Sequence, residues 1–135
     1  MSDARLLLQK AIYARLTGNA PLMAKLTGVF DFVPDNQAFP FVQIGEMDFT
    51  PWDTHTFDGF EGVITINLWG RPGSRGRAAL HDIQNDIYNL LHRWIPTISG
   101  FTAVSMRYDF SNIIVDPDAV TYHGVQRFKI LMGGN

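Results

Sequence analysis

The residues with the clearest chemical potential are the arginines of segment 70–77. Arg71, Arg75 and Arg77 are interspersed with three glycines where a predicted strand gives way to a predicted helix. Backbone N–H groups and the helix dipole favour anions at a helix N-terminus, and arginine adds bidentate contacts to phosphate. The spacing matches neither the dinucleotide fingerprint nor the phosphate-binding loop. The segment therefore fits either a plain soluble turn or a basic tongue that touches nucleic acid or an acidic subunit surface.

Histidines and carboxylates offer little further chemistry. His81 and His92 lie eleven residues apart on one predicted helix, which separates them by about 16 Å along its axis, too far to share a metal. Asp116 and Asp118 flank a proline, and although paired carboxylates can act as acid and base, Asp-Pro-Asp is ordinary turn sequence. The chain has no cysteine, which excludes thiolate catalysis and disulfide bonds. We expect no enzyme activity, no metal and no cofactor.

Length and composition predict a single domain over residues 1–135. The chain is 46% hydrophobic and 18% charged, as in ordinary globular domains of this size. Its net charge of 11 − 13 = −2 provides no general attraction to nucleic acid. No apolar run approaches the roughly 18 residues of a membrane span, and the N-terminus lacks the pattern of a signal peptide. We expect a soluble protein, made in a cytoplasm, with no membrane partner.

These candidate residues must be positioned by a mixture of helices and strands. Helical periodicity and capping residues predict helices over 3–17, 21–26 and 75–94. Alternating hydrophobic residues predict strands over 29–33, 41–47, 63–69, 101–110 and 120–132. In 63–69, Ile64, Ile66 and Leu68 should face the core, while Trp69 should face the other way. In 101–110, the alternation predicts that Tyr108 and Phe110 share one face.

The order of these elements predicts an α+β fold. An antiparallel β-sheet should carry two main α-helices packed on one face, with a long inter-strand loop. The opposite face, or an edge strand, would remain available to a neighbouring subunit. Candidate side chains on that side are Thr65, Asn67, Trp69, Arg107 and Arg127.

The predicted inter-strand loop covers residues 48–62. It carries large aromatic residues among Thr, Asp and Gly, without a sustained period of two or 3.6. Loops of about fifteen residues inside compact domains are usually functional or disordered. Two interpretations remain open for this segment. Its aromatic residues fold back onto their own sheet, or Trp52, Phe57 and Phe60 form an arm that is buried on another subunit or partner.

The ordered set of features resembles the tail-terminator (tail-completion) proteins of long-tailed phages and gene transfer agents. The likeness begins with a Leu/Ala-rich N-terminal helix and spans nearly the whole chain. Each piece alone is unspecific, and their order and spacing carry the resemblance. The further pieces are Val33-Pro34, the Phe-Pro-Phe-Val-Gln-Ile-Gly-Glu segment 39–46, Ile-Asn-Leu-Trp at 66–69 before the Gly/Arg-rich loop, Asp-Pro-Asp at 116–118, and His-Gly-Val-Gln-Arg-Phe at 123–128.

The resemblance implies a structural virion protein of the tail and neck, assembled in the bacterial host cytoplasm. It implies a homo-oligomer, a hexameric ring, that caps the tail tube, stops its polymerisation and joins the tail to the head. The implied partners are the major tail tube protein and the head connector or stopper protein. The family has no catalytic residues to carry over.

Within this picture the candidate residues take two roles. Trp52, Phe57, Phe60 and Trp69 are candidates for the subunit or tube interface, since aromatic residues are enriched among interface hot spots. Arg71, Arg75 and Arg77 are candidates for a channel or anion contact, where they would touch passing DNA without sequence specificity. The alternatives are a head–tail connector or stopper protein of the neck, and a small-ligand-binding or enzymatic α+β domain.

Overall fold

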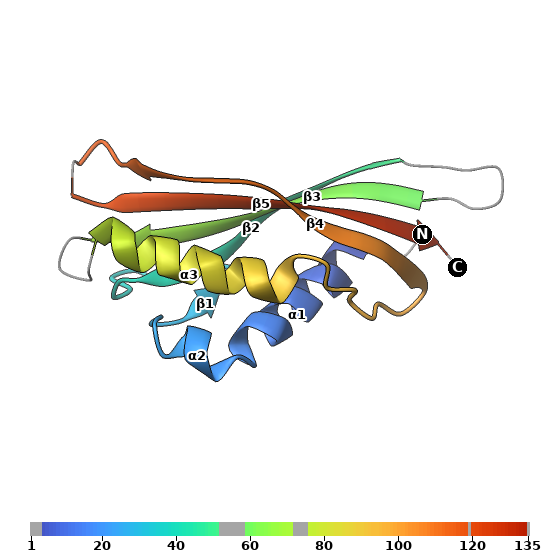
Figure 1. Ribbon diagram of the computed structural model, residues 1–135, viewed down its shortest axis with the longest axis horizontal. Helices are drawn as coiled ribbons and strands as arrows, with labels where there is room; N and C mark the ends of the chain where they lie inside the picture. Colours follow the sequence, from blue (N-terminus) through green and yellow to red (C-terminus); the bar gives the residue numbers. More distant parts are fainter. Residues whose placement is uncertain (1–3, 52–58, 72–75, 119, 135) are drawn as a thin grey trace.

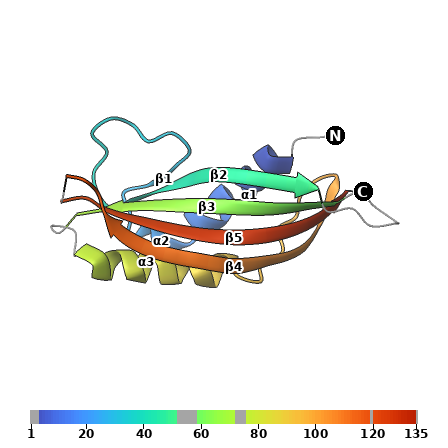
Figure 2. The same ribbon diagram turned by 90° about the horizontal axis from the view of Figure 1, so that it is seen from above.

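A computed structural model describes residues 4–51, 59–71, 76–118 and 120–134 of the chain. The five strands form one sheet with the order β1-β2-β3-β5-β4, in which β1 pairs parallel to β2 and every other pair is antiparallel (Figure 1, Figure 2). The helices are α1 (Ala4–Thr17), α2 (Ala20–Met23) and α3 (Gly76–Leu91). The strands are β1 (Val29–Phe30), β2 (Phe41–Pro51), β3 (Gly59–Gly70), β4 (Phe101–Val115) and β5 (Tyr122–Gly134).

In the described part of the chain, the three helices lie on the same face of the sheet, and no helix covers the other face (Figure 1). The predicted α+β class and its one-sided helix layer are therefore confirmed. Ile64, Ile66 and Leu68 point into the helix layer and have no exposed surface. They meet the buried stripes of α1 and α3, which are Leu8, Ile12 and Leu16 on α1, and Leu80, Ile83, Ile87 and Leu91 on α3. Among the described residues, no helix is long and apolar enough to cross a membrane.

Polar contacts fix α3 on the sheet as well. Gln126 on β5 is buried, and its amide nitrogen donates a hydrogen bond of 3.0 Å to the carbonyl oxygen of Gln84 on α3. The Gln84 amide donates in turn to the carbonyl oxygen of Asn112 on β4, at 3.3 Å. Gly124 leaves room for this arrangement, because a Cβ there would lie 3.0 Å from the Gln84 amide nitrogen. These two bonds tie α3 to β5 and β4, since a shift of the helix would leave the buried amide nitrogens without partners.

The prediction of a fifteen-residue loop over 48–62 is wrong in its extent. Strand β2 continues through Pro51 and β3 begins at Gly59, with Asp48 paired to Val63 and Pro51 paired to Phe60. The alternation of apolar residues that predicts a strand is interrupted at Gly62, where a Cβ would lie 2.5 Å from the Phe49 ring. Glycine in a strand often marks such a close approach. A register shift between Ile44 and Met47 further disturbs the alternation in β2. Residues 52–58 lie outside the described part.

The predicted face of Phe110 is also wrong. A register shift between Tyr108 and Phe110 places Tyr108 opposite the buried Phe128, whereas Phe110 lies opposite the exposed Arg127. A β-bulge adds one residue to one strand and so reverses the faces of the side chains beyond it. Sequence alternation alone cannot locate such a bulge, because the alternation of apolar and polar residues continues unchanged through the bulge.

Several predicted boundaries also differ from the structure. Helix α3 ends at Leu91 rather than at residue 94, because Arg93 adopts a φ of 65° and its N–H bonds to the Met106 carbonyl at 2.7 Å. The short helix begins at Ala20 because Asn19 caps it by accepting a hydrogen bond from the Leu22 N–H. Strand β1 is shorter than predicted, and β4 is longer.

Candidate assembly surface

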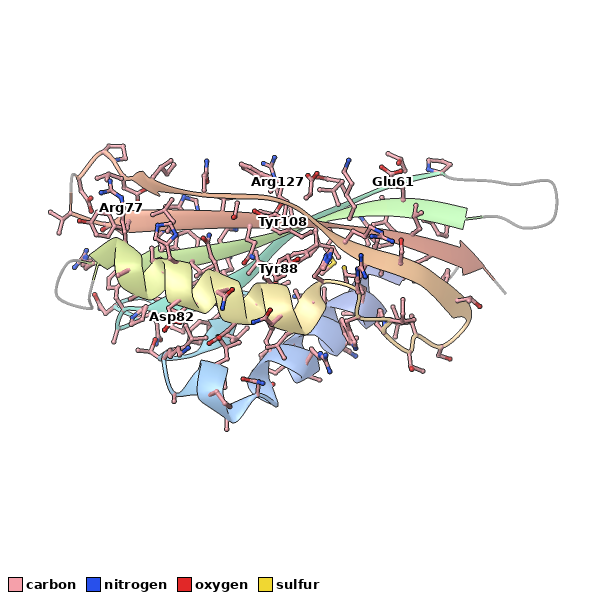
Figure 3. All side chains as sticks on the ribbon, in the orientation of Figure 1. Glu61, Arg77, Asp82, Tyr88, Tyr108 and Arg127 are labelled. Carbon is pink, nitrogen blue, oxygen red and sulfur yellow. The ribbon has the colours of Figure 1, made fainter. Side chains whose placement is uncertain are left out.

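The helix-free face of the sheet, here called the open face, consists of the outward side chains of β2, β3, β5 and β4. The prediction that Thr65, Asn67 and Trp69 lie on this side is confirmed, because they alternate along β3 with the buried core residues. Arg127 is paired with Thr65 on the neighbouring strand. Figure 3 shows Arg127 and Glu61 on the side of the sheet away from the helices. Arg107 pairs with the exposed Lys129 and lies on the same face.

One end of the open face is aromatic. The Trp69 ring lies parallel to the His123 ring, with centroids 4.6 Å apart and an interplanar angle of 5°. On its other side Trp69 stacks on Phe41 at 5.5 Å, and Phe41 contacts Phe39 at 5.2 Å. These rings come from three strands and the segment before β2. Trp69 is therefore held rigidly in a row of side chains rather than projecting alone, which lowers the entropy cost of using it in a contact.

A shallow hollow of about 350 Å³ opens beside this row. Phe32, one of its lining residues, is 83% exposed. The hollow, here called the aromatic hollow, is lined by Phe32, Val33, Phe39, Phe41, Gln43 and Trp69. An exposed phenylalanine beside a hollow of aromatic rings is typical of a protein contact site.

A second, polar hollow of about 540 Å³ continues along the open face and shares Gln43 with the first. Asp31, Glu46, Thr65 and Arg127 are among its lining residues. Asn67 and His123 also line this polar hollow, and the His123 Nε2 lies 3.0 Å from the Asn67 Oδ1. In the described part of the chain, no three histidine, aspartate or glutamate side chains are grouped so as to hold a metal ion.

The charges of the open face are separated between its two halves. One half is formed by β2, β3 and the segment after β1. All charged side chains that it presents are acidic, and its outward side chains include no lysine or arginine. The half formed by β5 and β4 is mainly basic, although Asp109 lies 3.9 Å from Lys129. The acids are Asp31, Glu46, Asp48 and Glu61, and the bases are Arg107, Arg127 and Lys129.

Two of the three candidate arginines are brought together at the start of β5. The Arg71 guanidinium lies over the Phe39 ring at 4.4 Å, and its Nε donates to the Thr121 hydroxyl at 3.3 Å. Arg77 is exposed and lies over the Tyr122 ring at 5.1 Å. Cation–π contacts of this kind orient the guanidinium without neutralising its charge. Arg75 lies outside the described residues.

The aromatic arm is placed only in part. Phe60 lies on β3, on the core side, where it is half-buried against Phe49 and Phe101 at centroid distances of 6.1 and 6.2 Å. These contacts lie within its own chain, and the role of Phe60 at a subunit or tube interface stays a prediction. Trp52 and Phe57 lie outside the described residues, and their roles remain predictions.

The acidic pair at 116 and 118 is turn structure. The Asp118 carboxylate accepts hydrogen bonds from the Thr121 hydroxyl, the Thr121 N–H and the Val120 N–H, at 2.7 to 2.9 Å. These bonds lower the pKa of Asp118 to about 2, helped slightly by the charge of Arg71. Asp118 is thus ionised at neutral pH and has no proton to donate as a general acid.

Comparison with known proteins identifies the family. A family model described as "Tail completion protein gp17" matches residues 10–133. The chain belongs to this family of phage tail completion proteins. It is 28% identical over 128 residues to the tail completion protein gp17 of Bacillus phage SPP1, covering 95% of this chain and 93% of that protein. The resemblance deduced from the order of sequence pieces is therefore confirmed.

Solved structures share the fold of this gp17 family member. The structure of the bacteriophage SPP1 gp17 protein matches with a TM-score of 0.67 at 28% identity, over 96% of this chain and 91% of that chain. A chain of the virion of a native gene transfer agent particle matches with a TM-score of 0.89 at 20% identity, over 99% of this chain and 100% of that chain. The latter likeness concerns the fold alone.

The aromatic row yields a prediction about pH. Burial lowers the pKa of His123 below its ordinary value of 6.5, and the charge of Asp116 opposes that shift in part. The unfolded chain therefore takes up this proton at a higher pH than the folded chain does. The stabilisation of the folded chain that follows from this lowered pKa is fully present above about pH 6.5. It is lost as the pH falls toward the lowered pKa of His123. Substitution His123→Phe retains a ring on Trp69 but cannot titrate.

We expect the free energy of unfolding of the native protein to fall relative to that of His123→Phe between about pH 7.5 and pH 5.5. Urea unfolding followed by tryptophan fluorescence at several pH values measures this difference, and all other titrating groups are common to both proteins. Curves that stay parallel across this range would contradict the assignment.

Proposed function

We propose that this chain forms a hexameric ring at the end of a tail tube, in the virion of a phage or gene transfer agent. The ring stops polymerisation of the major tail tube protein and presents a surface to the head connector or stopper protein. The match of the family model over residues 10–133 carries this proposal. The named relative in phage SPP1 is a tail completion protein. A completed tail has to stop growing and has to be joined to a head. Residues 1–135 act as one tail-terminator-like domain with no catalytic role.

The open face supports an assembly role. Most antiparallel sheets with one helix-covered face present a polar second face to water. Here that second face carries the aromatic hollow and the polar hollow, which share Gln43. Trp69 is the anchor of the aromatic hollow. A ring requires heterologous contacts, in which two different patches of each subunit meet. The separation of acids and bases on the open face provides two such different patches.

Along the chain, residues 52–58, here called the tip, come directly before β3 (Gly59–Gly70), and the arginine segment 70–77 begins where β3 ends. Each end of the ring could therefore contact a different partner. We assign Trp52 and Phe57 at the tip to a neighbouring subunit or the tube protein. We assign Arg71, Arg75 and Arg77 to the channel, where a ring of guanidinium groups would contact the phosphates of passing DNA.

The ring and the tip are tested together by native mass spectrometry. We expect the 15.2 kDa chain to be recorded as a hexamer. A variant in which Asn-Gly replaces residues 52–58 should remain folded by circular dichroism, because the strand pairs on either side are kept. This variant should fail to form rings. A matched variant, Trp52→Ser with Phe57→Ser, keeps the length of the tip. It separates the effect of removing the aromatic rings from the effect of shortening the segment.

Full-size rings from both tip variants would show that the tip makes no subunit contact. A native chain that stays monomeric in solution and on purified tail tubes would contradict the ring itself. Capped tails that fail to join heads when the chain is removed would favour the connector or stopper function.

The arginine assignment is tested with Arg75→Glu and Arg77→Glu combined. Arg71 is left unchanged because it contacts Phe39 and Thr121 within the chain. We expect tails of normal length with infectivity or gene transfer reduced about tenfold or more, since reversed charges repel DNA phosphates. The control variant, Arg75→Lys with Arg77→Lys, keeps the charge and should retain activity. Tails of abnormal length would instead place these residues at the tube interface.

A further inference from the structure

We propose that the two long edges of the open face are the two halves of the subunit contact, so that the β4 edge of one copy docks on the β2 edge of the next. The occupant of each edge is a second copy of this chain. The inference rests on the proposed ring and specifies which surfaces close it. It is carried by the match of side chains at equal heights along the two edges.

Strand register defines these heights. In one row across the sheet, Asp48 on β2 is paired with Val63, which is paired with Lys129, which is paired with Arg107 on β4. The two ends of this row thus carry opposite charges. Asp48 and Arg107 are both exposed. Within the described residues, neither has an ion-pair partner in its own chain.

A second row, near the other end of the sheet, has apolar ends. Phe41 on β2 is paired with Trp69, Trp69 with His123, and His123 with Ile114 on β4. The β2 end of this row is the aromatic hollow. The β4 end exposes Ile114, with 48% of its surface accessible. A hollow on one edge and an exposed aliphatic side chain on the other thus lie at the same height.

The directions of the strands allow the two edges to meet. Successive strands β2, β3, β5 and β4 alternate in direction, so β4 runs antiparallel to β2. Rotation about an axis along the strands moves a copy sideways and leaves every row at its original height. The docking of β4 beside the uncovered part of the neighbour's β2 would therefore continue the alternation there, with Arg107 near the neighbour's Asp48. At the other end β1 lies along β2, so Ile114 would approach the aromatic hollow from the side of Phe32 and Val33.

The edges also differ in a way that disfavours a closed two-fold dimer. Strand β1 covers β2 only beside Val42 and Gln43, so the acidic stretch that contains Glu46 and Asp48 has no strand neighbour among the described residues on that side. Two β2 edges facing each other would bring acid against acid, and two β4 edges would bring Arg107 against Arg107. The juxtaposition of like charges disfavours such contacts. The charges thus select head-to-tail contacts, the type of contact from which a ring is built when the rotation between copies closes.

Charge reversal tests the contact. Arg107→Asp and Asp48→Arg each place like charges across every subunit contact, and we expect each to raise the concentration needed for half-assembly about tenfold or more. The double variant restores opposite charges and should form rings again. An equal mixture of the two single variants should also form rings, because alternating copies restore attraction at every contact. Lys10→Asp, an exposed charge change on α1, is the matched control and should assemble normally.

Mass photometry or native mass spectrometry measures the oligomer size in all five samples. Rings in the mixture would show that both single variants are folded, because misfolded chains could not assemble on mixing. Rings in both single variants, at native concentrations, would overturn the inference while leaving the proposed ring intact. Single variants that fail and are rescued neither by the double variant nor by mixing would also overturn it. A native chain that never assembles would contradict the ring and this contact together.

Discussion

The structure depends on one constraint, the two-residue period of four paired antiparallel strands. Because every second side chain points to the helices, the sheet must bury one set of residues and leave the other set bare. Ile64, Ile66 and Leu68 satisfy the first demand against α1 and α3. The bare set cannot be optimised for the same core, so its chemistry is available for another purpose. In this member of the gp17 family, the bare set combines an aromatic end, a polar depression and two halves of opposite charge.

That arrangement suits the role that we propose, in which stopping a polymer and joining it to another body depend on surface fit. Several polar side chains of the described residues make contacts within the fold. Asp118 closes the β4–β5 turn. His123 stacks on Trp69 and lies within hydrogen-bonding distance of Asn67. His92 accepts a hydrogen bond from the Tyr108 N–H through its Nδ1 at 2.9 Å. Each of these contacts holds a side chain in place on the sheet or at its turn.

The sequence predicted those features that depend on local pattern. The alternation in 63–69 predicted the buried face of β3 and the outward position of Trp69, both of which the structure confirms. It failed where a local pattern is broken by a contact far away in the chain. Gly62 resembled a loop residue because its space is filled by Phe49, and the bulge before Phe110 leaves no mark in the alternation. The row of Phe41, Trp69 and His123 requires the register of three strands, which no single segment specifies. Phe60 was linked to the arm by its type alone, and its position on the core side of β3 follows from a strand register that the segment does not specify.

Cross-linking measures the proposed subunit contact most directly. The chain contains no cysteine, so a variant with Asp48→Cys and Arg107→Cys can form only introduced disulfides, which need Cα atoms within roughly 7 Å. Under mild oxidation we expect a ladder on a denaturing gel, from the monomer up to a covalent hexamer. Each single-cysteine variant should remain monomeric on that gel, because position 48 meets position 107 and not itself. Rings that assemble without any cross-link, or efficient dimers from a single-cysteine variant, would contradict the account.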